Sequence, residues 1–179
     1  MNKLFFGLLL IYLDVNINIG SHTLNLLPDW AGYCLLFSGL LDLAGESEKF
    51  TKAKPLCLGM AVYTGVLWVL NLVVGSASLG IFDWILSLAA TAVSLYILYL
   101  IVSAIGDIET SRAVSIGQPK LMSAWKVMAV AYGAAQVLTI LVALAVICLI
   151  VGFVATVVFM VYFNNTRKAY NQLPPLQAL

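Results

Sequence analysis

The sequence predicts an all-α, polytopic membrane protein that folds as a compact bundle of six transmembrane helices, with both termini in the cytoplasm. Three observations support this: an extreme composition, a series of membrane-length apolar stretches, and a one-sided distribution of basic residues. Of the 179 residues, 63% are hydrophobic and only 9% are charged, and the mean hydropathy is +1.03. Soluble domains carry roughly 25% charged residues, because polar groups must cover their surface. We therefore expect most of this surface to face lipid.

Apolar stretches recur along the chain at the length of a membrane span. A helix rises about 1.5 Å per residue, so crossing about 30 Å of hydrocarbon requires roughly 20 residues. The last apolar run, 121–163, is interrupted only by Lys126 and must fold as a hairpin of two spans. We place its turn near 143–146, although no Gly, Pro or charge marks it. The predicted spans are 4–20, 27–44, 55–74, 82–106, 121–142 and 145–163.

The N-terminal run is interpreted as the first span. Lys3 precedes an apolar stretch, as in a signal peptide, but no small-x-small cleavage site follows before Gly20. The six spans then form a single transmembrane domain, residues 1–165, followed by a short cytoplasmic tail, residues 166–179.

Basic residues decide the predicted orientation. Cytoplasmic loops retain Lys and Arg, whereas translocated loops avoid them. With six spans and an internal N-terminus, all nine basic residues fall on or near the cytoplasmic side. A five-span alternative, with 121–163 as one tilted helix, would place Arg167 and Lys168 outside. The charge distribution therefore favours the six-span arrangement.

Asp14 is the first candidate for a binding site. It lies about 16 Å along the first span from Lys3, close to the middle of the bilayer. An ionisable group at that depth is costly unless it faces a cavity or a partner, so it is a functional-site hypothesis. Asn18 and His22 follow Asp14 at intervals of four residues, so one helix face carries all three if the helix persists past Gly20.

Other polar residues lie in the same leaflet. Asn71 and Gln136 are about 24 Å from the inner ends of their spans, and Asp29 and Asp83 stand at the outer ends of theirs. We therefore expect a polar site in the outer half of the bundle. Its predicted ligand-binding residues are Asp14, Asn18, His22, Asp29, Asn71, Asp83 and Gln136.

Structural roles compete with this interpretation. Asn71 and Gln136 also suit interhelical hydrogen bonds, and Asp29 and Asp83 suit helix N-caps. Asp14 can equally belong to a tightly coupled structural network. The two aspartates at outer helix ends are each followed by a Trp, which indicates either duplication of a two-helix unit or the ordinary preference of Trp for the membrane interface.

No catalytic, metal or cofactor site is predicted. His22 has no second His or Cys nearby, and the three cysteines, Cys34, Cys57 and Cys148, form no CxxC pair. The HExxH and GxSxG motifs of hydrolases are absent from the sequence. Nucleic acid is not an expected partner, because Lys and Arg form no cluster.

Several motifs resemble a group of small bacterial integral membrane proteins. These share an aromatic-Gly start, a Leu-Asp pair within the first span, and a Leu-Pro-Asp-(Phe/Trp)-x-Gly-Tyr motif. The matching residues here are Phe6-Gly7, Leu13-Asp14, and Leu27-Pro28-Asp29-Trp30-Ala31-Gly32-Tyr33, and the stretch 50–55 is also similar. The resemblance covers the first third of the chain. It implies a multi-pass protein of the bacterial cytoplasmic membrane and supplies no activity.

Three functions remain open at this point. The predicted outer site favours a small-molecule or ion-binding component of a transporter, and the size and span count are similar to the substrate-binding subunits of energy-coupling-factor vitamin transporters. No nucleotide-binding loop is present, so active transport would need another membrane or ATPase subunit, or an ion gradient. The alternatives are a non-catalytic accessory or sensory subunit and a membrane-embedded enzyme. The expected partners are the lipid bilayer and such a subunit, with a homo-oligomer as a further alternative.

Overall fold

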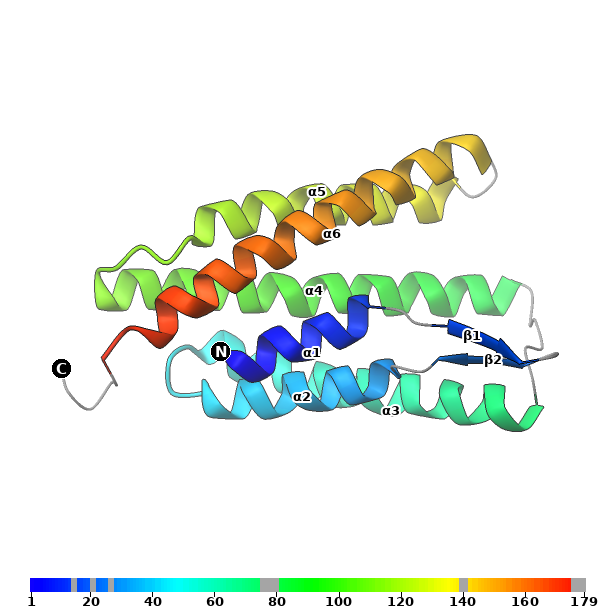
Figure 1. Ribbon diagram of the computed structural model, residues 1–179, viewed down its shortest axis with the longest axis horizontal. Coiled ribbons are helices and arrows are strands. Elements are labelled where there is room, and N and C mark those ends of the chain that lie inside the picture. The colour runs from blue at the N-terminus through cyan, green and yellow to red at the C-terminus, as the bar shows by residue number, and fades with distance from the viewer. Residues whose placement is uncertain (14–15, 20–21, 26–27, 75–80, 139–141, 175–179) are drawn as a thin grey trace.

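The computed structural model describes residues 1–13, 16–19, 22–25, 28–74, 81–138 and 142–174. In the two strands, only the backbone is described. The described residues form six helices and one antiparallel pair of strands (Figure 1). In chain order these are α1 (Asn2–Tyr12), β1 (Asn16–Ile19), β2 (His22–Asn25), α2 (Asp29–Asp42), α3 (Glu48–Val74), α4 (Ile81–Arg112), α5 (Gln118–Val137) and α6 (Val142–Asn171).

The helices are arranged as a closed ring. Each helix contacts the next one along the chain, and α1 also contacts α6. In Figure 1, α4 runs along the middle of the view, with α5 above it and α1, α2 and α3 below it, while α6 runs diagonally from above α4 and crosses it. Strand β2 contacts α3, so the hairpin extends the α1–α2 unit alongside that helix.

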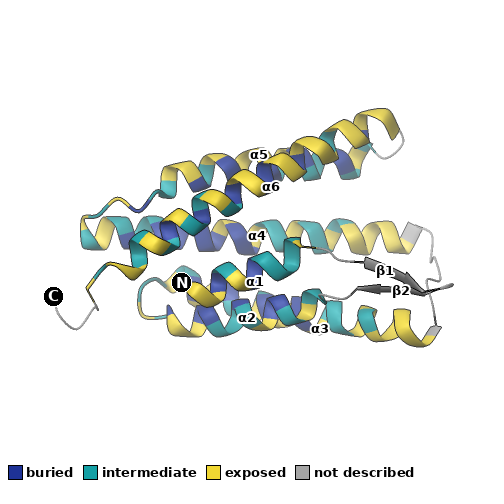
Figure 2. Ribbon diagram, in the orientation of Figure 1, coloured by how far each residue is buried: buried dark blue, intermediate teal, exposed yellow. Residues whose placement is uncertain are grey.

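Apolar side chains fill one end of this ring, which we call the closed end. It holds the start of α1, the α2–α3 and α4–α5 connections, and the C-terminal part of α6 (Figure 1). Figure 2 shows that exposed residues dominate the opposite ends of α3, α4 and α6, which we call the open end. The completely buried side chains of the closed end come from every helix and include Leu4, Leu40, Phe50, Ile101, Ile105, Leu121, Phe159 and Phe163.

Glycines bring α1 and α2 into backbone contact. A Cβ added to Gly7 would lie 2.8 Å from the carbonyl oxygen of Gly32, and a Cβ added to Gly32 would lie 2.8 Å from that of Gly7. Small residues allow helix backbones to approach in this way. The short helix α1 is therefore held by close packing against α2.

The predicted first span, 4–20, is wrong. Helix α1 ends at Tyr12, and the chain then enters β1, where Asn18 pairs with Thr23 and Ile19 pairs with His22. The sequence from 14 to 19 alternates polar and apolar residues, which is the period of a strand and not of a helix. Helices α1 and α2 have 11 and 14 residues, so at about 1.5 Å per residue neither crosses about 30 Å of hydrocarbon alone.

Among the residues that the structure describes, three helices, not six, are long and apolar enough to cross a membrane. They are α3, α4 and α6. Helix α5 has 20 residues, or about 30 Å, but includes Lys120 and Lys126. The prediction of six helices is therefore confirmed, while the count of six membrane spans is not shown.

The turn between the last two helices also differs from the prediction. Helix α5 ends at Val137 and α6 begins at Val142, so the break lies earlier than 143–146. Helix α6 continues to Asn171, into the predicted tail.

Ion pairs hold the closed end together. Lys3 pairs with Asp42 at 2.7 Å, and Lys49 pairs with Asp107 at 2.7 Å. Arg112 pairs with Glu46, and both side chains are only 7% exposed. The hydroxyl of Tyr170 donates to the same Glu46 carboxylate at 2.7 Å, which joins the end of α6 to the α2–α3 connection.

Glu109 caps the start of α5. One of its carboxylate oxygens accepts hydrogen bonds from three successive backbone N–H groups, those of Ile116, Gly117 and Gln118, at 2.7, 2.7 and 2.9 Å. Gly117 has a φ of 103°, a conformation that glycine adopts at no steric cost. The carboxylate thereby satisfies donors that a helix start leaves unpaired.

Candidate functional site

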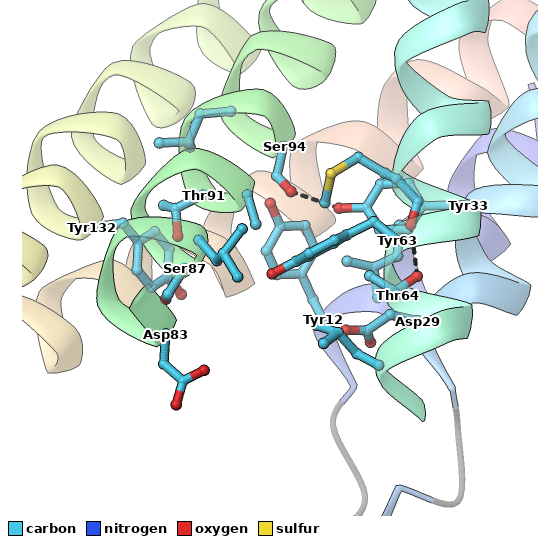
Figure 3. A pocket seen from close by; sticks show the side chains of 16 residues that line it. Tyr12, Asp29, Tyr33, Tyr63, Thr64, Asp83, Ser87, Thr91, Ser94 and Tyr132 are labelled. Atoms are coloured by element: carbon cyan, nitrogen blue, oxygen red, sulfur yellow. Dashed lines mark hydrogen bonds between the residues drawn. The ribbon is translucent and has the colours of Figure 1, made fainter. Parts of the chain in front are cut away.

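A cavity of about 470 Å³ opens inside the ring, on the open-end side of the apolar core. Residues of α1, α2, α3, α4 and α5 line it. This volume lies within the range of small-molecule sites, about 300–1,000 Å³. Its polar lining residues, labelled in Figure 3, are Tyr12, Asp29, Tyr33, Tyr63, Thr64, Asp83, Ser87, Thr91, Ser94 and Tyr132.

Helix α4 contributes one wall as a polar stripe. Asp83, Ser87, Thr91 and Ser94 follow at intervals of four, four and three residues, so they lie on one helix face. The side-chain amide of Gln136, on α5, donates to the hydroxyl of Ser87 at 3.3 Å and to that of Thr91 at 3.5 Å. This interaction fixes the hydroxyl groups of the wall from outside the cavity.

A hydrogen bond across the ring marks the inner limit of the cavity. The hydroxyls of Tyr33, on α2, and Ser94, on α4, are 2.5 Å apart, and Tyr33 is almost fully buried. One turn further along each helix, Leu36 and Ile97 belong to the apolar core. The core therefore closes the cavity towards the closed end, and a ligand moving along the inside of the ring reaches the cavity from the open end.

Two tyrosines extend into the cavity from α1 and α3. Figure 3 shows the rings of Tyr12 and Tyr63 reaching towards the α4 wall. Their hydroxyls make no hydrogen bond to any residue that the structure describes. The neighbouring hydroxyl of Thr64, in contrast, donates to the carbonyl oxygen of Met60 in its own helix at 2.8 Å. A ligand can therefore engage the two tyrosine hydroxyls without breaking a described hydrogen bond.

Tyr132 forms the side of the cavity next to α6. Its hydroxyl lies 3.0 Å from that of Thr156, a buried residue of α6, which in turn donates to the carbonyl oxygen of Gly152 at 2.9 Å. A Cβ added to Gly152 would lie 3.2 Å from the Tyr132 ring, so the glycine makes room for the aromatic side chain. The orientation of Tyr132 is thus determined by both packing and a hydrogen bond.

The cavity lining has an acidic balance. It includes Asp29 and Asp83 but no Lys, Arg or His among the described residues. Each aspartate lies in the first turn of its helix, α2 or α4, where the positive end of the helix dipole attracts negative charge. Figure 3 places the two carboxylates on opposite sides of the cavity. The helix starts thus present two acidic groups at its open side.

The predicted site residues have different outcomes. Asp29 and Asp83 line the cavity, and Gln136 supports its α4 wall. Asn71 is exposed on α3 and does not line the cavity.

The N-terminal part of the predicted site is not a helix face. Asp14 lies outside the described residues. The backbones of Asn18 and His22 belong to different strands, so the predicted helical alignment of 14, 18 and 22 is wrong. The side chains of these two residues are likewise not described. Within the described part of the chain, no group of three or more His, Cys, Asp or Glu residues could hold a metal ion.

Sequence reasoning missed the tyrosines and most of the hydroxyl groups. Tyr12, Tyr33, Tyr63 and Tyr132 are spread over four helices, and no local pattern connects them. The period of four in the α4 stripe was a usable signal, because it places an aspartate and three hydroxyl side chains on one face of an apolar helix.

Comparison with known proteins supplies no relative. No family model, no curated protein and no solved structure matches the chain.

Proposed function

We propose that this protein is a multi-pass membrane protein that binds a small molecule in the cavity of its helix ring, as the binding component of a transport system. The observation that carries the proposal is the cavity itself: about 470 Å³ lined by ten polar side chains inside an otherwise apolar bundle. Polar groups in a membrane bundle are costly and commonly mark a substrate pathway.

A lipid environment accounts for the apolar surface. Residues such as Val62, Val73, Phe82, Ile150 and Phe153 are between 59% and 76% exposed. Large contiguous apolar surfaces on a soluble protein indicate binding or aggregation, whereas lipid tails solvate them without penalty. We place the protein in the cytoplasmic membrane of a bacterium, as the motif resemblance implies.

All six helices can belong to the membrane even though three are too short or too polar by themselves. The hairpin extends α1 and α2 alongside α3, and non-helical backbone is tolerated at membrane depth where protein covers it. The ion pairs of Lys3, Lys49 and Arg112 lie at the closed end. Because basic residues stay in the cytoplasm, the closed end faces inside and the cavity faces outside.

A site open to one side and closed by a packed core suits a binding subunit. A ligand enters from outside, and further passage requires the closed end to open. That step needs free energy from another subunit or from an ion gradient. The arrangement therefore supports a substrate-binding component over an enzyme acting alone.

The proposal is tested by ligand-dependent stabilisation of the purified protein. A library of amines, amino acids, carboxylates, sugars, nucleosides and vitamins is screened by thermal unfolding in detergent. A ligand present at 100 times its Kd stabilises the folded state by about 2.7 kcal/mol. Stabilising compounds are then tested on Ala90→Phe, which fills the cavity, and on Ala92→Phe, the same change at an exposed position of α4.

We expect at least one compound to stabilise the wild type and Ala92→Phe but not Ala90→Phe. If no compound stabilises the wild type, or if the cavity-filling variant responds equally, the proposed binding function is wrong.

A further inference from the structure

The charge of the cavity lining restricts the ligands that it can accept. Two carboxylates, Asp29 and Asp83, face the cavity from opposite sides, and the described lining has no basic side chain. An anionic ligand would meet like charges on both sides and would find only hydroxyl donors. In a low-dielectric bundle such repulsion is strong, and the attraction of a cation is correspondingly strong.

Aromatic rings add a second preference for a cationic ligand. Four tyrosines line the cavity, and the face of an aromatic ring carries negative charge that attracts ammonium and guanidinium groups. The hydroxyls of Tyr33 and Tyr132 already interact with Ser94 and Thr156. These bonds hold the rings in place. The other two hydroxyls, of Tyr12 and Tyr63, remain as acceptors for N–H donors.

Apolar lining residues indicate an organic ion rather than a bare metal ion. Between the polar groups lie Ile11, Met60, Leu67, Leu86 and Leu95. A metal ion would gain nothing from these side chains, and within the described chain the carboxylates are too few for a cluster of three ligating groups. An organic molecule buries its apolar part against them.

We infer that the cavity binds an organic cation, in which an ammonium or guanidinium-type group lies among the two aspartates and the tyrosine rings and an apolar part contacts the leucines. This inference rests on the proposed binding function and specifies its ligand class. Each component acts on a different part of the ligand. The carboxylates select charge, the rings select a diffuse cation over a small hydrated one, and the apolar residues select an organic body.

The experiment compares probes of similar shape that carry a positive, a neutral or a negative group. One set is benzamidinium, benzamide and benzoate. The other is choline, its neutral carbon isostere 3,3-dimethylbutan-1-ol, and the anion 3,3-dimethylbutanoate. Binding to the purified wild type in lipid nanodiscs is measured by calorimetry at low and high salt.

We expect the cation of at least one set to bind about tenfold or more tightly than its neutral isostere, with no binding of the anion and weaker cation binding at high salt. Asp29→Asn and Asp83→Asn should each weaken the cation at least about tenfold and leave the neutral probe unchanged. Asp42→Asn is the control, because that carboxylate pairs with Lys3 at the closed end.

A further pair of variants separates the ring from the hydroxyl. Tyr63→Phe keeps the aromatic face and should retain most of the cation affinity, whereas Tyr63→Leu should lose about tenfold. Folding of each variant is checked by its melting temperature, and a variant that does not fold is replaced by the remaining substitutions of the set.

Three results overturn the inference: no cation binds, a neutral or anionic probe binds as tightly as its cationic partner, or cation binding persists in Ala90→Phe. These results leave the proposed binding function intact, because that function fails only if no compound binds in the cavity. If the library contains a neutral or anionic compound whose binding is lost in Ala90→Phe, the cavity binds small molecules but the ligand class is wrong.

Discussion

Replacing Gly32 by Ala should separate α1 from α2. The added Cβ would lie 2.6 Å from Cγ1 of Ile11 and 2.8 Å from the carbonyl oxygen of Gly7. Carbon atoms pack best at about 3.5–4.0 Å, so the two helices must move apart by roughly 1 Å. Because one of the two contacts is with backbone, a side-chain rotation cannot relieve it. Overpacking of this kind costs about 1–3 kcal/mol.

Two other glycines provide controls at which the same substitution should not lower the stability of the protein. A Cβ added to Gly59, in α3, or to Gly133, in α5, meets nothing within 4 Å. In a helix interior, Gly is about 1 kcal/mol less favourable than Ala, so Gly59→Ala and Gly133→Ala should be neutral or stabilising.

The assay is thermal unfolding of the purified variants in one detergent. One kcal/mol shifts the melting temperature of a chain of this size by about 2–4 °C. Gly32→Ala should therefore melt about 2–12 °C below the wild type, while the control variants melt at or above it. A Gly32→Ala protein as stable as the wild type, or equal losses in all three variants, would refute the close approach of α1 and α2.

The remaining predictions concern the closed end, the wall next to α6 and the topology. Arg112→Leu should destabilise the protein by about 3–5 kcal/mol in denaturant unfolding, because it leaves the buried Glu46 carboxylate without its cation. Adding Glu46→Leu should recover part of this loss. Tyr132→Phe should cost about 0.5–1.5 kcal/mol in the wild type and little in a Thr156→Val background, where the bond between the two hydroxyls is already lost; equal losses in the two backgrounds would show that the two hydroxyls act separately. In cells, cysteines introduced at Thr23 and Ser78 should react with an impermeant maleimide from outside, whereas cysteines at Ser47 and Ser115 should not. External labelling at Ser115 would invalidate the proposed orientation.

Hydropathy identified those helices that contain a continuous apolar stretch of membrane length. The stretches 55–74 and 82–106 lie inside α3 and α4, because lipid-facing helices need continuous apolar sequence. It failed at 14–19, where polar and apolar residues alternate with the period of a strand. The length of an apolar stretch alone therefore cannot distinguish a spanning helix from a short helix followed by a strand.

The site was predictable only in part, for a related reason. Asp29 and Asp83 were found because a charged residue beside a long apolar stretch is easily recognised, even when the exact start of the helix is unknown. Tyr12 and Tyr132 become neighbours of the same cavity only through closure of the ring, and the contact of α1 with α6 depends on residues more than 100 positions apart. No local pattern contains that information.

The most direct test of an outward-facing cavity is chemical access to its wall. Thr91→Cys, in a variant whose three native cysteines are replaced by Ala, is treated in sealed vesicles with a small, impermeant, trimethylammonium-bearing thiosulfonate. Ile101→Cys, in the apolar core two to three turns further along the same helix, is the control. We expect Thr91→Cys to react from the outside only, Ala90→Phe to prevent that reaction, and Ile101→Cys to react from neither side. Reaction of Thr91→Cys from the cytoplasmic side alone, or of neither position, would contradict an outward-facing cavity.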